Sequence, residues 1–365
     1  MPLPNLSDLL RYAVELGASD LHIATGVPPA LRLDGTLRPV GEDVLSADDT
    51  RTLVLGLLTD QQRARLEQDW ELDFAVQIQG VGRFRGNAHF SRGAVEAAFR
   101  HIPETIPELS TLGHRPSIRR ATELKGGLVL VTGVTGSGKS TTMAALVNTI
   151  CQERTAMIIT VEDPVEYIFR SAGSIIKQRE VGTDTHSFPE ALRHVLRQDP
   201  DVILIGEMRD LETIRTAITA AETGHLVFAT LHTIDAPKAI DRIVDAFPGD
   251  QQSQVLAQLA NALEMVISQR LLPTESGTGR ALASEILVAN TPVRACIRDR
   301  RFEQLIGLIE IGARDGMHTI DDSLSDLFLS GQISKDTAVA HARDRNRIGL
   351  LERTPPPKAK RGLFG

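Results

Sequence analysis

The sequence predicts an α/β protein with a parallel sheet in its second domain. Four short runs are almost entirely apolar, and a helical pattern follows each of them: GGLVLVTG, AMIITVED, DVILIGE and HLVFATLH. Strands buried on both faces have this composition, and their alternation with helices indicates crossover connections in a parallel sheet. After residue 238 the pattern is mostly helical. A chain of 365 residues is too long for one ordinary core, so we expect two domains.

The first hundred residues predict a smaller α/β domain. LSDLLRYAVEL carries apolar residues at near-helical spacing with Ser7 as its candidate N-cap, and SDLHIAT and ALRLDGTLRPV alternate apolar and polar residues. The DG dipeptide marks the turn of a hairpin. We predict a first domain over 1–102, a proline-rich linker over 103–117, a second domain over 118–350 and a disordered basic tail over 351–365.

Composition and charge argue against several classes of protein. The net charge of −7 weakens a nucleic-acid-binding interpretation, because nonspecific binders of nucleic acid are usually basic. No apolar run approaches the roughly 18 residues of a membrane span, and the first residues do not read as a signal peptide, so we expect a cytoplasmic protein. Cys151 and Cys296 lie far apart in apolar surroundings, which predicts buried thiols. The lack of any CxxC pair excludes a zinc module.

The stretch GVTGSGKS matches the phosphate-binding pattern GxxxxGK[ST] and lies between a predicted strand and a predicted helix. Its glycines let backbone N–H groups approach phosphate oxygens, and the helix N-terminus adds positive partial charge. Lys139 is placed to bridge the β- and γ-phosphates of ATP, and Ser140 to ligate Mg²⁺. The predicted nucleotide-binding residues are Gly133, Val134, Thr135, Gly136, Ser137, Gly138, Lys139, Ser140 and Thr141.

Two acidic segments complete this predicted site. DVILIGEMRD ends an apolar strand on Glu207, which is expected to hold Mg²⁺ through water and to order the attacking water. ITVEDPVEY brings together Glu162, Asp163 and Glu166. Like charges this close repel one another unless a cation compensates, so a Mg²⁺–nucleotide pocket explains the cluster better than a solvated loop does.

These motifs, together with GASDLHIATGVPPALRLDGTLRPV, resemble those of the secretion-ATPase superfamily, and in particular the PilT/PilU-type twitching-motility ATPases. The resemblance covers about residues 5–345. It implies a PAS-like domain followed by a RecA-like ATPase domain. It also implies a Mg²⁺-dependent homohexamer at the cytoplasmic face of the inner membrane, peripheral to the bilayer, beneath the pilus platform protein. ATP-driven domain rotation in such a ring would power retraction of type IV pili.

The resemblance also implies roles for single residues. Glu207 matches the Walker B carboxylate, and VEDPVEY matches the Asp box, in which Glu166 is the first and Glu162 the second candidate for polarising the attacking water. Arg85 and Arg100 have the fifteen-residue spacing of two arginines that related ATPases direct toward the γ-phosphate at a subunit boundary.

The two histidines of AAETGHLVFATLHT lie on either side of one predicted strand, too far apart to share a metal ion. His232 follows the strand, at the edge where doubly wound sheets bind ligands, so we expect it to sense the γ-phosphate with Thr230 nearby. His225 enters the strand from the other edge, where geometry alone makes it a turn or packing residue. The family's histidine box makes it a secondary catalytic candidate.

Two features of the sequence bear on whether such an ATPase would retract pili or assemble them. PVRACIRD keeps Arg294, Ile297 and Arg298 of an AIRNLIRE-like helix found in retraction ATPases. The four-cysteine zinc element typical of assembly and type II secretion ATPases is missing from the sequence. Retraction is therefore the main prediction. The alternatives are an accessory PilU-like ATPase riding on a paralogous motor, or an assembly or type II secretion ATPase; a nucleic-acid translocase is disfavoured by the charge.

Overall fold

The computed structural model describes residues 5–33, 36–102 and 105–352, which form two compact units. The smaller unit contains the residues up to Thr105 together with Pro164–Ile168. The larger unit contains Ile106–Asp163 and the described residues from Phe169 to residue 352. Residues 103–104 of the predicted linker, 353–365 of the predicted tail and the DG dipeptide of the predicted hairpin lie outside the described residues.

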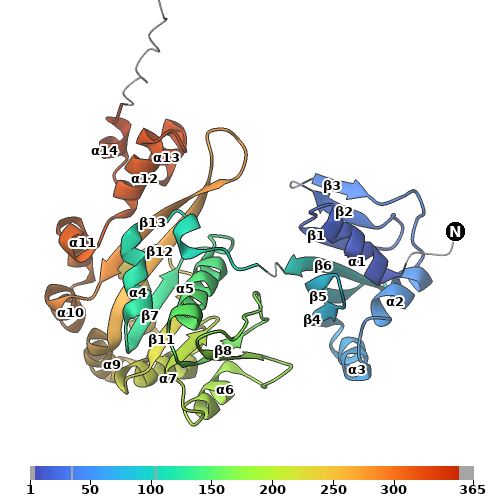
Figure 1. The fold of residues 1–365 in the computed structure, drawn as a ribbon, viewed down its shortest axis with the longest axis horizontal. Coiled ribbons are helices and arrows are strands. Elements are labelled where there is room, and N and C mark those ends of the chain that lie inside the picture. Colours follow the sequence, from blue (N-terminus) through green and yellow to red (C-terminus); the bar gives the residue numbers. More distant parts are fainter. Residues whose placement is uncertain (1–4, 34–35, 103–104, 353–365) are drawn as a thin grey trace, which may run out of the picture. The chain divides into compact units, whose positions relative to one another are not determined.

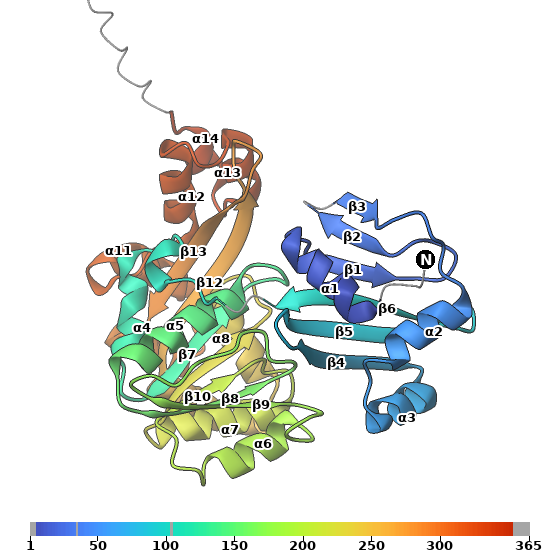
Figure 2. The same cartoon turned by 45° about the vertical axis from the view of Figure 1, so that its right-hand side comes forward.

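The smaller unit is an antiparallel sheet with three helices, and it is α/β as predicted. Its strand order is β3-β2-β1-β6-β5-β4. The strands are β1 (Asp20–Ile23), β2 (Ala30–Leu33), β3 (Thr36–Pro39), β4 (Glu71–Ile78), β5 (Gly82–Ser91) and β6 (Ala94–Ile102), and the helices are α1 (Leu6–Glu15), α2 (Ala47–Leu55) and α3 (Asp60–Asp69). Helices α1 and α2 pack on the sheet, as Figure 2 shows, and enclose a core of leucines, phenylalanines and alanines.

The start of α1 differs from the sequence prediction. The helix begins at Leu6 and its N-cap is Asn5, whose side chain accepts a hydrogen bond from the N–H of Asp8. Ser7 lies inside the first turn, so its prediction as N-cap was wrong. An N-cap needs extended backbone and a side chain that reaches the third helical residue, and Asn5 provides both.

The larger unit is built on a seven-stranded sheet with the order β13-β12-β7-β11-β10-β8-β9 (Figure 1). Only β13 runs antiparallel to its neighbour, and the other adjacent strands are parallel. The strands are β7 (Gly127–Thr132), β8 (Met157–Glu162), β9 (Ile175–Glu180), β10 (Val202–Ile205), β11 (Leu226–Leu231), β12 (Leu263–Pro273) and β13 (Arg280–Val288). The four apolar runs are thus the parallel strands β7, β8, β10 and β11, almost completely buried as predicted.

Helices cover both faces of this sheet. On one face, α6, α7 and α9 join the strands in a single apolar core, while α5 packs against β7. The helices are α4 (Arg120–Glu123), α5 (Lys139–Glu153), α6 (Phe188–Val195), α7 (Leu211–Glu222), α8 (Ala236–Asp245), α9 (Gly249–Ala262), α10 (Thr291–Arg298), α11 (Leu305–Ile311), α12 (Ile320–Leu329), α13 (Lys335–His341) and α14 (Arg345–Gly349), with 3₁₀ turns at Leu109–Thr111, Pro116–Arg119, Phe302–Gln304 and Ala313–Asp315. None of the described helices is long and apolar enough to cross a bilayer.

Sequence reasoning missed three strands of the larger unit. The helical C-terminal part is confirmed, but the long strands β12 and β13 interrupt it and pair over nine residues. Strand β9 lies at the edge of the sheet, where its half-exposed residues carry no apolar run. Both cysteines are free and buried, as predicted.

Candidate nucleotide-binding site

The loop between β7 and α5 is shaped by its glycines. Gly138 is the N-cap of α5 and has φ +88°, a conformation that other residues rarely adopt. A Cβ at Gly133 would lie 2.4 Å from Ser137 Oγ and 2.5 Å from the carbonyl oxygen of Gln269. Only glycine therefore lets the chain leave the strand at this point, and α5 starts directly behind the loop.

Lys139, the first residue of α5, folds back onto the loop that precedes it. Its Nζ donates to the carbonyl oxygens of Gly133 at 2.8 Å and Val134 at 3.2 Å, and the residue is only 9% exposed. The N-terminus of α5 and the ammonium group thus lie at the same loop. Both favour an anion, because the helix end carries unpaired N–H groups and positive partial charge.

Gln269 of β12 holds the loop between β7 and α5 through a hydrogen bond that was not predicted. Gln269 Nε2 donates to the carbonyl oxygen of Ser137 at 2.8 Å, and Gln269 is 1% exposed. One residue earlier, Ser268 Oγ accepts a hydrogen bond from Thr132 Oγ1 at 2.8 Å. The sequence signal for these contacts is weak, because they depend on the pairing of β12 with β7, which local patterns do not reveal.

Glu207 lies just beyond β10 and is held by two side chains. Its Oε2 is 2.7 Å from Arg209 Nη2, and its Oε1 is 3.0 Å from His232 Nε2. Burial alone would raise the pKa of Glu207, but the hydrogen bond from Arg209 and the nearby His232 outweigh it, so the pKa lies below its usual range. The carboxylate is therefore ionised at neutral pH. Arg209 was missed by the sequence analysis, although it lies within the DVILIGEMRD segment.

The Asp-box carboxylates lie in different surroundings. Glu162 is the last residue of β8, is 8% exposed, and its Oε1 accepts hydrogen bonds from Thr160 Oγ1 at 2.6 Å and Gln178 Nε2 at 3.2 Å. Glu166 is exposed and lies in the segment Pro164–Ile168. Glu162 is thus part of the larger unit's sheet edge.

The parallel sheet brings most of the predicted residues of the larger unit to one edge. Strands β7 and β11 end together, since Thr132 pairs with Leu231, and β8 and β10 end within two residues of that level, since Ile205 pairs with Ala229 and Val161. The P-loop, Glu162, Glu207 and His232 follow or end these strands and therefore share the carboxyl edge. Thr230 Oγ1 contributes a hydrogen bond to the carbonyl oxygen of Gly206 at 2.5 Å. His225 enters β11 from the amino edge and does not belong to this group.

Comparison with known proteins identifies the family to which a chain with this arrangement belongs. A family model described as "Type II/IV secretion system protein" matches residues 3–314. The chain belongs to the type II/IV secretion system protein family. As a family member with a P-loop and a parallel sheet of this kind, it is an ATPase that binds nucleotide.

Two relatives are similar over almost their whole length. The protein named "Type IV pilus retractation ATPase PilT" of Pseudomonas aeruginosa is 43% identical over 339 residues, which cover 93% of this chain and 98% of the relative. "Type IV pilus ATPase PilU" of the same organism is 42% identical over 344 residues, which cover 94% and 90%. The structure titled "Crystal Structure of the Pilus Retraction Motor PilT and Bound ADP" has a TM-score of 0.89 at 44% identity and covers 95% of this chain and all of that one.

The two predicted arginines of this secretion-family ATPase lie in the smaller unit. Arg85 of β5 and Arg100 of β6 are directly opposite one another in the antiparallel ladder. Arg100 Nε donates to Asp20 Oδ1 at 2.8 Å, and the Arg100 side chain remains 69% exposed. Like charges directly opposite one another are unfavourable on a sheet. The two arginines that are fifteen residues apart in the sequence are thus direct cross-strand neighbours in the structure.

The PVRACIRD segment forms most of α10, and its three matching residues, Arg294, Ile297 and Arg298, have different surroundings. Arg294 donates to the carbonyl oxygens of Ala260 and Asn261 at the end of α9 and pairs with Glu264 at 2.6 Å. A cation at a helix C-terminus is favourable, so Arg294 stabilises α9. Ile297 is fully buried, whereas Arg298 is exposed.

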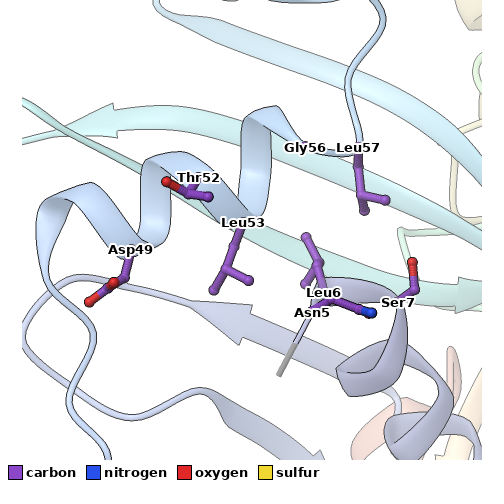
Figure 3. Close-up of a pocket in the computed structure, with 8 residues that line it drawn as sticks. All are labelled: Asn5, Leu6, Ser7, Asp49, Thr52, Leu53, Gly56 and Leu57. Carbon is purple, nitrogen blue, oxygen red and sulfur yellow. The ribbon is translucent and has the colours of Figure 1, made fainter. Parts of the chain in front are cut away.

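A pocket of about 330 Å³ in the smaller unit does not coincide with the family's nucleotide site. It lies between the start of α1 and the helix α2 (Figure 3). Its lining residues are Asn5, Leu6, Ser7, Asp49, Thr52, Leu53, Gly56 and Leu57. No predicted site residue is among them, and Asn5 and Asp49 are already engaged in capping α1 and α2.

Proposed function

We propose that this ATPase powers retraction of type IV pili, as a Mg²⁺-dependent homohexamer at the cytoplasmic face of the inner membrane, where it contacts the pilus platform protein. The observation that carries the proposal is the 43% identity to a PilT over nearly the full length of both chains. The P-loop and the carboxyl-edge cluster support the chemistry that such a motor requires.

ATP fits the residues at the carboxyl edge. Lys139 already makes two hydrogen bonds to loop carbonyls, and it would exchange them for β- and γ-phosphate oxygens. Exposed residues Val134, Thr135 and Gly136 form the tip of the loop, where phosphate oxygens have access to backbone N–H groups.

Mg²⁺ would be held jointly by the protein and the nucleotide. Within the described part of the chain, no group of three or more His, Cys, Asp and Glu side chains is arranged to hold a metal ion. Ser140 would supply a hydroxyl, Thr141 would lie beside the phosphates, and Glu207 would act through water. When bound, the cation would neutralise charge on the phosphates.

Hydrolysis then needs an oriented water molecule. Glu207, ionised and fixed by His232, would hold that water, while His232 would sense whether a γ-phosphate is present. Glu162 and Glu166 are the candidates for polarising it. Arg85 and Arg100 would approach the γ-phosphate of a neighbouring subunit, whose negative charge would offset the repulsion that remains between them.

The proposal is tested by Lys139→Ala, with the exposed Lys125→Ala as a matched control. Loss of the ammonium group is expected to reduce ATPase activity about 100-fold or more and to abolish twitching, with an unchanged melting temperature. Lys125 precedes β7 at the other edge of the sheet, so its variant is expected to behave like wild type. Normal ATPase activity and twitching of Lys139→Ala would refute the proposal.

An accessory retraction ATPase is a second candidate, because the identity to PilU is 42%. Expression in a host that lacks only its PilT-type ATPase separates the two. Restored twitching supports the principal motor. Rescue only of a host that lacks its PilU-type ATPase supports the accessory role.

A further inference from the structure

An ion pair between a buried glutamate and a partly exposed arginine of the larger unit lies outside the residues assigned to hydrolysis. Glu285 of β13 is 1% exposed, and its Oε2 lies 3.2 Å from Arg343 Nη2. The same Nη2 lies 3.6 Å from Asp235 Oδ2. Burial raises the pKa of Glu285 above its usual range, and the charge of Arg343 only partly offsets that shift, to which Asp235 adds. A carboxylate so completely removed from water is stable as an ion only with such a partner.

The C-terminal helical part holds Arg343 in place through its backbone. Arg343 lies between α13 and α14, and its N–H donates to Asp321 Oδ1 at 2.8 Å. The next N–H, of Asp344, donates to Asp321 Oδ2 at 2.9 Å. Asp321 lies on α12 and is 5% exposed. The guanidinium is thus presented by a fixed segment.

On its other side, the ion pair fixes the beginning of α8. Glu285 Oε1 accepts a hydrogen bond at 3.1 Å from the N–H of Ala236, the first residue of that helix. Asp235 is the N-cap of α8, and its Oδ1 accepts a hydrogen bond from the N–H of Lys238. His232 lies only three residues before this N-cap. The loop from His232 to Asp235 is therefore anchored at one end by β11 and at the other by Glu285 and Arg343.

The sheet register connects the same pair to the P-loop strand. Glu285 is opposite Ser268, Ser268 is opposite Thr132, and Thr132 is opposite Leu231. Thr132 is the last residue before the P-loop, and Leu231 is the last residue before His232. One row of residues across four strands thus joins the buried carboxylate to both halves of the nucleotide site.

We propose that Arg343 and Glu285 are positioning residues, whose ion pair fixes the loop from His232 to Asp235 and thereby the contact of His232 with Glu207. The inference rests on the proposed roles of His232 and Glu207 in hydrolysis. It adds that the C-terminal helical part sets the rate of hydrolysis without contacting nucleotide.

The test compares Arg343→Met with Arg347→Met in the purified full-length protein. Arg347 also belongs to the C-terminal helical part and pairs with Asp322 at 2.7 Å, but its side chain is 48% exposed and does not reach α8. We expect Arg343→Met to lower kcat about 10- to 100-fold with KM for ATP nearly unchanged, since misplacing a catalytic group affects the reaction step. Arg347→Met is expected to keep kcat within about twofold.

Two further variants separate positioning from stability. Arg343→Lys keeps the positive charge and is expected to recover most of kcat. The double variant Arg343→Met/Glu285→Gln removes the uncompensated carboxylate, so its melting temperature is expected to return close to that of wild type. Its kcat is expected to stay low, because no charge then holds Asp235.

A double variant with both normal melting temperature and normal kcat would overturn the inference, since the pair would then act on stability alone. So would an Arg343→Met variant that changes KM but not kcat. These assays use ATP and purified protein. Normal twitching of cells whose Arg343→Met enzyme has the expected low kcat would therefore count against the proposed retraction function, and not against this inference.

Discussion

The two ends of β11 carry a histidine each, and the two histidines have different surroundings. At the carboxyl end, His232 contacts the ionised Glu207 beside the P-loop. At the amino end, His225 Nδ1 lies 3.0 Å from the carbonyl oxygen of Ala220 and 3.1 Å from Thr223 Oγ1, so it closes the end of α7. The difference teaches that topology, and not residue type, decides which histidine lies beside Glu207 and the P-loop, because parallel strands collect their following loops at one edge.

The amino edge is polar as well, but its groups are engaged in structure. A cavity of about 320 Å³ there is lined by Gly126, Gly127, Ala221, Glu222, Asn261, Ala262 and Glu264. Glu222 accepts a hydrogen bond from Gln258, and Glu264 pairs with Arg294. These carboxylates link neighbouring elements, Glu222 joining α7 to α9 and Glu264 joining β12 to α10, whereas Glu207 lies at the edge that carries the P-loop.

The largest difference between the edges is expected for Glu207→Gln. Loss of its charge should reduce kcat about 100-fold while nucleotide affinity stays within about threefold, because the amide still fits between Arg209 and His232. Steady-state ATPase rates and titration with a fluorescent ADP analogue measure the two effects. Glu222→Gln at the amino edge is the control and should leave both unchanged; equal effects of the two substitutions would contradict the comparison.

A smaller loss is expected for His232→Asn. The substitution removes one hydrogen bond to an ionised carboxylate, worth about 1.5 kcal/mol, which corresponds to about a tenfold lower kcat. Single-turnover hydrolysis measures the step directly. A variant with wild-type rate would show that Glu207 is adequately held by Arg209 alone.

Arg209→Ala is expected to change the pH dependence more than the maximal rate. The hydrogen bond from Arg209 helps to hold the pKa of Glu207 below its usual range, and burial acts in the opposite direction. Without Arg209 the pKa of Glu207 rises, so the carboxylate becomes protonated at a higher pH and the acid limb of the kcat profile moves upward. An unmoved acid limb would mean that this limb does not report Glu207.

The smallest effect is expected for His225→Asn. It should leave ATPase activity within about twofold and lower the free energy of unfolding by about 0.5–1 kcal/mol, the typical contribution of one hydrogen bond. Denaturant titration and ATPase assays measure both. A large loss of activity with unchanged stability would instead support the histidine-box role for which His225 is the secondary candidate.

The sequence predicted the carboxyl edge well because its elements are local. An apolar run, a glycine loop and the start of a helix define the P-loop within about twenty residues, and Glu207 directly follows another apolar run. Arg209 and Gln269 could not be found in this way, since their contacts arise from loop geometry and from the pairing of β12 with β7.

Strands β12 and β13 were missed for a related reason. Strand β12 begins at Leu263, immediately after α9 ends at Ala262, with no turn residue between them. The run ALEMVISQRLLP therefore continues the helical pattern smoothly, and only its place beside β7 makes it a strand. The Arg85–Arg100 pair shows the opposite case, in which a spacing known from related proteins corresponds to direct cross-strand neighbours.

The bonds of Lys139 to its own loop would make the proposed entry of nucleotide an exchange of hydrogen bonds. A ligand must replace the contacts with Gly133 and Val134 before it gains the ammonium group. A ligand with one phosphate offers few oxygens to offset that loss, whereas a polyphosphate can engage the amine and the helix end together. Under the proposed function, such a loop would discriminate by the number of phosphates before any base or sugar is recognised, and the two bonds of Lys139 would keep its shape between ligands.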